Sequence, residues 1–397
     1  MAARRRPRQR GPRIAILRAL SVPSGCATAL LLPALQRVLE GSDSAMVVVS
    51  AQEESVLGAV RVGEQIDDDV ALVVTTSGTT GPPKGAMLTA AALTASASAT
   101  HDRLGGPGSW LLAVPPHHIA GLQVLTRSLV AGSTPVELGV STGFDITELP
   151  AAIRNLAPGR RYTSLVAAQL AKALTDPAAA AALAELDAVL IGGGPAPRRV
   201  LAAAAAAGIA VVRTYGMSET CGGCVYDGVP LDGVRLRVLD DTRIVIGGAT
   251  LAKGYRNPLS PDPFAEPGWF RTDDLGAVDD SGVLTVLGRA DDAISTGGLT
   301  VLPQPVEAAL CTHPAVRDCA VFGRADDRLG QRVVAAIVVG DGCDPPTLDA
   351  LRSHVARTLD VTAAPRELHV VDALPRRGIG KIDRAALVRR FARAADQ

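Results

Sequence analysis

Short runs of β-branched and aliphatic residues alternate with longer Ala-, Leu- and Arg-rich stretches of helical pattern through the first half of the chain. Such short apolar runs are typical of buried strands, and the helical stretches between them are typical of crossover connections. Because strands covered by helices on both faces pair in parallel, the pattern predicts an α/β fold of parallel sheets covered by helices. The predicted strands lie at residues 46–49, 71–74, 110–114, 188–191 and 210–213.

The pattern changes after about residue 225, where short strands are spaced by Gly and Asp, as in VRLRVLD, TRIVIGG and GVLTVLGR. This change predicts a β-rich subdomain. From residue 303 onward a compact α+β pattern follows, with helices expected at 305–312, 347–358 and 384–394 and strands at 317–322 and 332–339. Since 397 residues exceed the size that one hydrophobic core usually reaches, we expect a large domain at 1–288 and a small domain at 289–397.

Charge and composition limit the partners of the chain. Lys plus Arg and Asp plus Glu number 40 each, so no net charge would draw the whole molecule to nucleic acid. The N-terminal stretch MAARRRPRQRGPR predicts a solvated tail. Polar residues interrupt the apolar stretch at 19–32, so no membrane segment is expected. Six scattered Cys and the lack of a secretory signal predict that the protein lies in the reducing cytoplasm. The sequence leaves open whether the chain forms a homo-oligomer.

The stretch VVTTSGTTGPPKGAMLT continues the predicted strand at 71–74. A loop rich in Gly, Thr and Ser that leaves a strand presents N–H groups and hydroxyls to phosphate oxygens, and Lys84 adds a positive charge. The P-loop motif G-x-x-x-x-G-K-[ST] does not match, because Pro83 stands where that motif requires Gly. A flexible linker would not carry Pro-Pro-Lys-Gly directly ahead of a predicted helix. The stretch therefore predicts a polyphosphate-binding loop.

The segment TSGTTGPPKG resembles the phosphate loop of the AMP-forming acyl-adenylate enzymes, the superfamily of acyl-CoA synthetases, luciferases and peptide-synthetase adenylation domains. Four more motifs resemble those of this superfamily and follow in its order: TYGMSET at 214–220, WFRTDDLG at 269–276, GRADDAIS at 288–295 and GIGKIDR at 378–384. The resemblance implies that ATP and Mg²⁺ activate a carboxylate to an acyl-AMP with release of pyrophosphate. The acyl group then passes to a thiol such as that of CoA.

The resemblance implies roles for the nucleotide-binding residues. The phosphate loop and Lys84 would hold the β and γ phosphates, Glu219 would hold Mg²⁺, and Tyr215 would stack on adenine. The Asp of the family's Thr-Gly-Asp pattern binds the ribose hydroxyls; its match is Asp274, since Asp273 replaces the Gly. The predicted ATP-binding residues are Thr76, Ser77, Gly78, Thr79, Thr80, Gly81, Lys84, Tyr215, Gly216, Asp274 and Arg289.

The same resemblance implies a mobile lid. The domain at 1–288 would bind ATP and the acyl group, and the domain at 289–397 would turn about a hinge near Asp291. Lys381 of the lid would approach both the α-phosphate and the attacking carboxylate. Gly297 and Gly298 would let the pantetheine arm of CoA come close, although Leu-Thr follows them where the family has Glu-Asn. The predicted catalytic residues are Lys381, His118, Glu219 and Thr80.

Three segments predict the acyl pocket. PPHHIAGL at 115–122 matches the family's His-x-x-Gly element through His118 and Gly121. YTSLVAAQLAKAL at 162–174 and VLIGGGPAP at 189–197 resemble the pocket wall of the 2-succinylbenzoate CoA ligases of menaquinone biosynthesis. A keto aryl diacid needs a short pocket with polar anchors. The predicted lining residues are His118, Ser164, Gln169, Gly192, Gly193, Gly194 and Thr220.

Alternatives remain open at this stage. The acid could be another aryl or medium-chain acid, or the chain could be a stand-alone adenylating module that loads a carrier protein, or a degenerate nucleotide binder. The segment Cys221-Gly-Gly-Cys224 has the C-x-x-C pattern of a redox dithiol or of half a zinc site, but the sequence has no second pair of this kind. We expect these two Cys to be small residues lining the acyl pocket.

Overall fold

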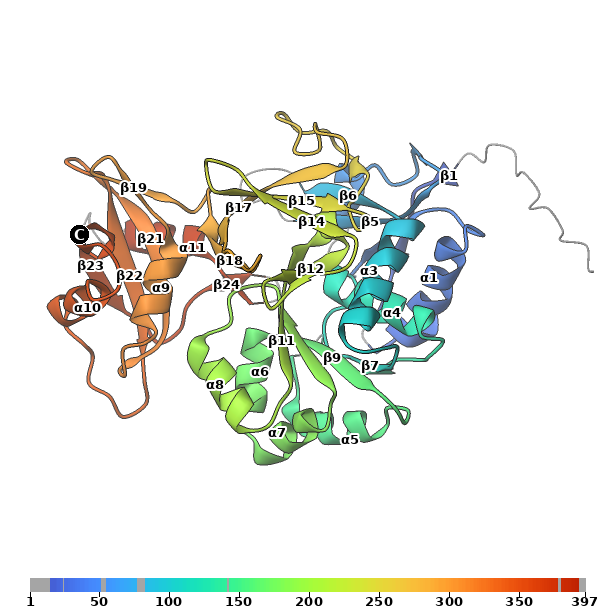
Figure 1. Ribbon diagram of the computed structural model, residues 1–397, viewed down its shortest axis with the longest axis horizontal. Helices are drawn as coiled ribbons and strands as arrows, with labels where there is room; N and C mark the ends of the chain where they lie inside the picture. Colours follow the sequence, from blue (N-terminus) through green and yellow to red (C-terminus); the bar gives the residue numbers. More distant parts are fainter. Residues whose placement is uncertain are drawn as a thin grey trace, which may run out of the picture.

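A computed structural model describes residues 15–23, 25–50, 55–76, 83–140, 143–377 and 380–392. A large unit carries the elements up to β18 (Leu284–Arg289), and the C-terminal unit projects from one side of it (Figure 1). Among the described residues, none of the helices is both long enough and apolar enough to cross a bilayer.

The first sheet of the large unit has the strand order β16, β6, β5, β3, β2. β2, β3 and β5 are parallel, whereas β6 is antiparallel to β5 and β16 is antiparallel to β6. The connection from β5 to β6 is too short for a parallel crossover, so these strands form a hairpin. The strands are β2 (Arg18–Ser21), β3 (Met46–Val49), β5 (Val70–Thr76), β6 (Lys84–Thr89) and β16 (Gly254–Tyr255).

The expectation of a helix directly behind the phosphate loop was wrong. Residues Lys84–Thr89 form strand β6, because they pair with β5 in register from Thr76 opposite Lys84 to Val70 opposite Thr89. The helix α3 (Ala90–Arg103) begins one strand later, where the Thr89 hydroxyl accepts a hydrogen bond from Ala92 N and caps it.

The second sheet has the order β13, β12, β11, β10, β9, β7, β8. The strands from β8 to β11 are parallel, as the alternating pattern predicted, and β12 and β13 extend the sheet antiparallel. The strands are β7 (Ser109–Leu112), β8 (Val136–Glu137), β9 (Arg161–Val166), β10 (Ala188–Gly192), β11 (Val211–Met217), β12 (Gly222–Tyr226) and β13 (Val229–Pro230).

Helices fill the space between the two sheets and cover the outer face of the second. Trp110 and Leu112 of β7 belong to the central core, together with residues of α1, α3 and α4, whereas Leu111 belongs to the core under α5, α7 and α8. Successive side chains of a strand point to opposite faces, which explains this division. The remaining helices of the large unit are η1 (Ala27–Leu31), α1 (Leu32–Leu39), α2 (Ser55–Ala59), α4 (Ile119–Val130), η2 (Ile146–Glu148), α5 (Leu149–Arg154), α6 (Ala167–Ala173), α7 (Pro177–Ala184), α8 (Arg198–Ala206) and η3 (Ser218–Thr220).

The predicted β-rich subdomain is a four-stranded antiparallel sheet of order β14, β15, β17, β18. Its strands are β14 (Val234–Val238), β15 (Arg243–Gly248), β17 (Trp269–Val278) and β18 (Leu284–Arg289). A separate two-stranded sheet pairs β1 (Ala15–Ile16) with β4 (Gln65–Ile66).

The C-terminal unit packs helices on both faces of one sheet. α9 and α10 cover one face of β21 and β22, and α11 covers the other. β23 adds in parallel to β22, and the sequence patterns had not indicated β19, β20 or β23. The elements are β19 (Ile294–Thr296), β20 (Leu299–Val301), α9 (Pro303–Leu310), β21 (Val316–Asp326), β22 (Gly330–Val339), α10 (Leu348–Val355), η4 (Val361–Ala363), β23 (Glu367–Val370), β24 (Arg376–Arg377), β25 (Lys381–Ile382) and α11 (Arg384–Ala392).

Candidate active site

The base of the β5–β6 hairpin is held by a side chain from β16's continuation. Asn257 Nδ2 donates to the carbonyl of Pro83 at 2.8 Å, and Gly85 N donates to Asn257 Oδ1 at 3.0 Å. The residue between them, Lys84, lies opposite Thr76 in the strand register. These bonds fix the backbone on both sides of Lys84, which places this residue at the end of the predicted phosphate loop. The loop residues themselves, Ser77, Gly78, Thr79, Thr80 and Gly81, lie outside the described residues.

Glu219 is a buried carboxylate beside this hairpin. It lies in η3 with 7% of its surface exposed, and the hydroxyl of Tyr255 donates to its Oε1 at 2.5 Å. The Lys84 ammonium lies 5.6 Å from the centre of the Tyr255 ring. Burial and the Glu219 charge raise the pKa of Tyr255, so that its phenol stays a donor. Three elements thus bring Lys84, Tyr255 and Glu219 together.

Asp274 and Tyr215 form the second part of the site. The hydroxyl of Tyr215, from β11, donates to Asp274 Oδ2 at 2.8 Å. Arg289 lies opposite Asp274 in the β17–β18 register, and its Nη1 is 3.5 Å from Asp274 Oδ1. The Asp274 side chain is 12% exposed, whereas that of Asp273 is 57% exposed and pairs with Arg243. The alternation of the strand therefore turns Asp274 inward and Asp273 to the surface.

Burial and nearby cations have opposite effects on the pKa of Asp274. Burial raises its pKa, while the Tyr215 hydrogen bond and the charges of Arg289 and Lys381 lower it, with a net rise. Burial and Asp274 raise the pKa of Tyr215 in turn. Since Lys381 acts on Asp274, the β25 segment of the C-terminal unit faces this part of the large unit.

Two further contacts join the C-terminal unit to the large unit. A Cβ added to Gly380 would lie 4.0 Å from the Cβ of Ala168 in α6. Arg199 Nη1, at the start of α8, donates to the carbonyl of Val316 at 3.1 Å. The segment that carries Lys381 therefore lies between the Asp274 cluster and α6, one wall of the predicted acyl pocket.

The His-x-x-Gly element starts helix α4. His118 occupies the N-cap position, where its carbonyl accepts from Leu122 N at 3.0 Å, and its ring lies 4.3 Å from that of His117 between centroids. A Cβ on Gly121 would come within 2.4 Å of the carbonyl of Pro115. Only glycine allows this approach, so Gly121 sets how closely the Pro-Pro segment folds over the helix.

Two of the predicted polar anchors brace the backbone. Gln169 Nε2 donates to the Ala113 carbonyl at 2.7 Å, and its Oε1 accepts from Val166 N at 2.9 Å. The Thr220 side chain is fully buried, and its hydroxyl contacts backbone groups of Met217 and Gly222. These bonds shape the ends of β7 and β11. A direct contact of Gln169 or Thr220 with a ligand stays a prediction.

The remaining predicted lining residues lie at the ends of β9 and β10. Ser164, on β9, is 8% exposed. A Cβ on Gly192 would come within 2.5 Å of Thr214 Oγ1, so the strand packs too closely for a side chain. Gly193 has a φ of 80°, which turns the chain, and Gly194 has open space around it. Gly216 pairs with Gly223 across β11 and β12, where a Cβ would come within 2.1 Å of the Gly222 carbonyl oxygen.

Cys221 and Cys224 do not line an open pocket. Both side chains are fully buried in the central core. Burial raises the pKa of Cys224 to about 12 and that of Cys221 further. Thiols with such pKa values react poorly, so the structure gives no support to a redox role for this pair, and the expectation that they line the pocket was wrong.

The predicted hinge and CoA-channel residues lie at the start of the C-terminal unit. Asp291 accepts two hydrogen bonds of 2.8 Å from Arg289, at Nε and Nη2. Gly297 and Gly298, with φ of 57° and 80°, form the two-residue turn between β19 and β20. Such a turn needs positive φ at both residues, which accounts for the Gly-Gly pair by itself. Tyr255 and Asn257 are the site residues that sequence reasoning missed.

Family models match most of the chain. The model of the AMP-binding enzyme family matches residues 40–256, and that of the AMP-binding enzyme C-terminal domain matches residues 305–381.

Named relatives and solved structures agree with these matches. A probable 2-succinylbenzoate–CoA ligase of Mycobacterium tuberculosis is 85% identical over 383 residues, which cover 96% of this chain and 100% of that protein. A 2-succinylbenzoate–CoA ligase of Bacillus pumilus is 36% identical over 349 residues, and the aligned region covers 81% of this chain and 69% of that protein. The o-succinylbenzoate CoA synthetase of Bacillus subtilis, solved with the acyl-adenylate OSB-AMP, superposes with a TM-score of 0.75 at 27% identity, covering 94% of this chain and 88% of that chain.

Proposed function

The chain belongs to the AMP-binding enzyme family, and on this premise we propose that it is an ATP-dependent 2-succinylbenzoate–CoA ligase of menaquinone biosynthesis. It adenylates a carboxylate of the acid with release of pyrophosphate, then transfers the acyl group to CoA. The observation that carries the proposal is the 85% identity, along the full length of the relative, to a mycobacterial protein named for this activity. ATP and CoA are cytoplasmic metabolites, and we place the reaction there.

The phosphates of ATP are bound at the β5–β6 hairpin in this proposal. Asn257 fixes the backbone on both sides of Lys84, and the charge of this side chain meets the β and γ phosphates. Thr76 at the end of β5 and the hydroxyls and N–H groups of residues 77–81 supply the remaining donors.

The residues beside the hairpin fit a magnesium ion. Among the described residues no group of three or more His, Cys, Asp or Glu could hold a metal alone, and Glu219 offers one buried carboxylate oriented by Tyr255. Mg²⁺ is usually held by one or two carboxylates together with substrate phosphates and water, which suits this donor set. When bound, the ion would offset the negative charge of the phosphates.

The Asp274 cluster binds the nucleoside. Tyr215 and Arg289 hold the carboxylate of Asp274 from two sides, so it accepts from the ribose hydroxyls in a fixed geometry, and the face of Tyr215 stacks on adenine. Lys381, whose charge lowers the pKa of Asp274, attracts the α-phosphate and the incoming carboxylate together in this proposal. Its charge offsets the repulsion of two anions that must meet.

Thioester formation needs a second arrangement of the two units. The buried core of the large unit extends to Leu284, and that of the C-terminal unit begins at Ile294. The residues between them belong to neither core. In this proposal, residues 289–397 form a lid that turns about Asp291. This rotation brings the Gly297–Gly298 turn to the channel of the pantetheine arm. His118, at the start of α4, closes the acyl pocket.

The test is pyrophosphate release across a panel of acids, with and without CoA. The proposal expects the highest kcat/KM with 2-succinylbenzoate and formation of its CoA thioester. Preference for a medium-chain or another aryl acid would overturn the substrate, and transfer to a carrier protein with no turnover of CoA would identify an adenylating module.

A further inference from the structure

Two cysteines of the C-terminal unit have their sulfur atoms in contact. Cys311 ends helix α9, and Cys319 lies in the neighbouring strand β21, which packs on that helix (Figure 1). Their Sγ atoms are 3.4 Å apart. A disulfide has an S–S distance of about 2.05 Å, so a closure of roughly 1.3 Å would join them. Sequence reasoning had considered only Cys221 and Cys224, because Cys311 and Cys319 form no recognised motif.

The two thiols have unequal chemical character. Cys319 is 2% exposed, and its Sγ lies 3.4 Å from both Cys311 Sγ and the Glu307 carbonyl. Cys311 is half-buried. The hydrogen bond with Cys319 lowers the pKa of Cys311 and the Arg199 charge lowers it further, against the opposing effects of burial and of the carboxylates of Asp318 and Glu307. The same hydrogen bond and burial raise the pKa of Cys319. Cys311 is the more exposed of the two thiols and the one whose pKa is lowered, so it is assigned as the nucleophile, and Cys319 as the thiol that attacks in the second step.

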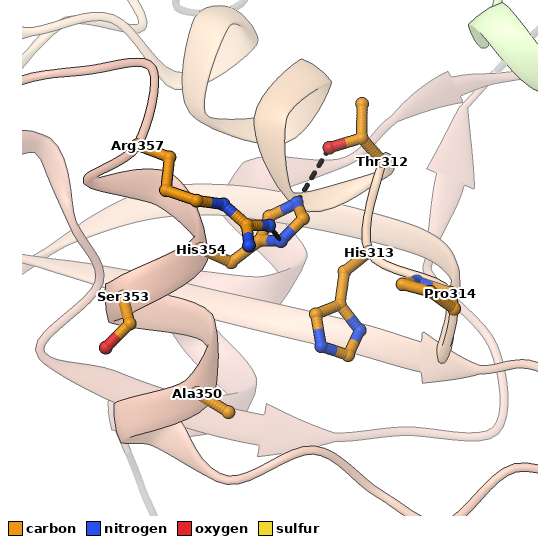
Figure 2. Close-up of a pocket in the computed structure, with 7 residues that line it drawn as sticks. All are labelled: Thr312, His313, Pro314, Ala350, Ser353, His354 and Arg357. Atoms are coloured by element: carbon orange, nitrogen blue, oxygen red, sulfur yellow. Dashed lines mark hydrogen bonds between the residues drawn. The ribbon is translucent and has the colours of Figure 1, made fainter.

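The chain around Cys311 is held in place beside an open hollow. The residues that follow it, Thr312, His313 and Pro314, line a hollow of about 750 Å³ (Figure 2). Thr312 Oγ1 is 2.7 Å from His354 Nε2 and donates to the Ala309 carbonyl at 2.7 Å. Solvent thus reaches the segment of Cys311, while these bonds hold Thr312, the next residue, against α9 and α10.

The other cysteines lack this combination. Cys221 and Cys224 are fully buried with raised pKa values, Cys26 is half-buried with no sulfur contact in the part of the chain that the structure describes, and Cys343 is exposed on a loop. Among the described residues, Cys311 and Cys319 are the pair that joins sulfur contact, access to solvent at one thiol and a lowered pKa of that thiol.

We propose that Cys311 and Cys319 are a redox modification site that closes to an intrachain disulfide when the protein meets a peroxide. The Cys311 thiolate attacks the peroxide oxygen, the O–O bond breaks, and a sulfenic acid forms at Cys311 as water leaves. The Cys319 sulfur then attacks the Cys311 sulfur; its proton leaves with the hydroxyl as a second water, and the S–S bond forms. Two thiols are oxidised and one peroxide is reduced.

The chain offers a direct readout of this bond, and it does not depend on ligase activity. Trypsin cleaves after Arg317, which places Cys311 in the peptide 290–317 and Cys319 in the peptide 318–324. The reduced full-length protein is treated with one equivalent of hydrogen peroxide, alkylated, digested without reductant and measured by mass spectrometry. We expect the two peptides as one linked species that separates on reduction, and free thiols falling from six to four per chain.

Single variants separate the two roles. Cys319→Ser is expected to accumulate a sulfenic acid at Cys311 that dimedone traps, and Cys311→Ser is expected to lose the link and react with peroxide at least tenfold more slowly. Cys343→Ser, the matched control, keeps the link. A wild-type protein that yields sulfinic acid at Cys311 without the linked pair, or that links Cys343 between chains instead, overturns the proposal.

Discussion

The hydroxyl of Tyr255 donates a 2.5 Å hydrogen bond to Glu219 Oε1, and the ring of the same residue lies 5.6 Å from the Lys84 ammonium. One side chain from the edge strand β16 thus connects the carboxylate of η3 with the cation of β6. It fixes the orientation of the carboxylate that we propose as the magnesium ligand.

Loss of this hydrogen bond should weaken magnesium binding. Residues that orient a metal ligand commonly change metal affinity about 10- to 100-fold when they are mutated. We expect Tyr255→Phe to raise the Mg²⁺ concentration for half-maximal adenylation about 10-fold, with a smaller change in kcat at saturating Mg²⁺. Glu219→Gln should abolish the response to added Mg²⁺ over the same range. An unchanged Mg²⁺ titration for Tyr255→Phe would contradict the role of this pair.

The adjacent carboxylates of β17 provide a matched test of the nucleoside site. Asp274 faces inward and is held by Tyr215, whereas Asp273 is exposed. Hydrogen bonds to charged groups contribute about 1.5–3 kcal/mol, so Asp274→Asn should raise the KM for ATP by roughly 10-fold or more. Asp273→Asn should stay within about twofold, as expected for exposed ion pairs. Equal effects of the two substitutions would show that the inward position of Asp274 is not what binds ATP.

Lys381 should act on adenylation alone. Removing one charge that stabilises a transition state commonly costs about 10²- to 10³-fold in rate, and we expect that loss for Lys381→Ala in ATP-dependent acyl-AMP formation. Thioester formation from supplied acyl-AMP and CoA should remain within about 10-fold of wild type. Lys253→Ala, which removes a surface cation paired with Asp67 and Asp69, serves as the control and should leave both rates nearly unchanged. Equal losses in both half-reactions of Lys381→Ala would count against the assignment.

The hinge can be tested by fixing its backbone. Proline restricts φ, so Asp291→Pro should retain acyl-AMP formation and lose most thioester formation if the lid turns at this residue. Asp291→Ala removes the same contacts with Arg289 but leaves the backbone free, and it should retain both half-reactions. Rapid-quench measurement of each half-reaction decides between them. If Asp291→Pro keeps thioester formation intact, the lid does not turn at this residue.

A buried histidine predicts a loss of stability in acid. His101 of α3 is 4% exposed and accepts a hydrogen bond from Trp110 Nε1 at 3.3 Å, while burial and the nearby charge of Arg127 lower its pKa to about 4. The folded pKa lies below the unfolded value, so the neutral ring stabilises the fold above about pH 6.5 and this contribution is lost as pH falls.

The size of this effect can be measured by denaturation. Between about pH 7 and pH 5 we expect the wild type to lose about 2 kcal/mol of unfolding free energy through His101. His101→Gln has no titrating ring at this position and should show a correspondingly smaller loss over the same range. Parallel pH profiles for the two proteins would show that the pKa of His101 is the same in the folded and unfolded states, against this prediction.

Sequence patterns predicted the layered architecture because apolar periodicity reports directly on burial. The alternation of strands and helices, the β-rich segment and the helices of the C-terminal unit are confirmed in the structure. Strand β6 was not predicted, because residues Lys84–Thr89 form a strand through their pairing with β5, which the local sequence does not indicate. Short strands such as β23 carry too few residues for a periodic signal.

Candidate site residues that belong to a sequence motif could be named from the sequence. Those that reach the site only through contacts between distant parts of the chain could not. Lys84, Glu219 and Asp274 stand in recognisable motifs, but nothing in the local sequence indicates that Tyr255 reaches Glu219 or that Asn257 clamps the hairpin. These partners lie 36 residues or more apart along the chain. The hydroxyl of Thr220 similarly looked like a free anchor, although backbone groups surround it.

The central claim is that this chain activates 2-succinylbenzoate as an acyl-AMP and passes it to CoA. A single-turnover experiment with enzyme, ATP, Mg²⁺ and 2-succinylbenzoate, quenched before and after the addition of CoA, tests it most directly. The account predicts one equivalent of pyrophosphate and enzyme-bound acyl-AMP before CoA, then the CoA thioester and AMP after it. Formation of ADP and phosphate, or an acyl-AMP that persists when CoA is added, would contradict it.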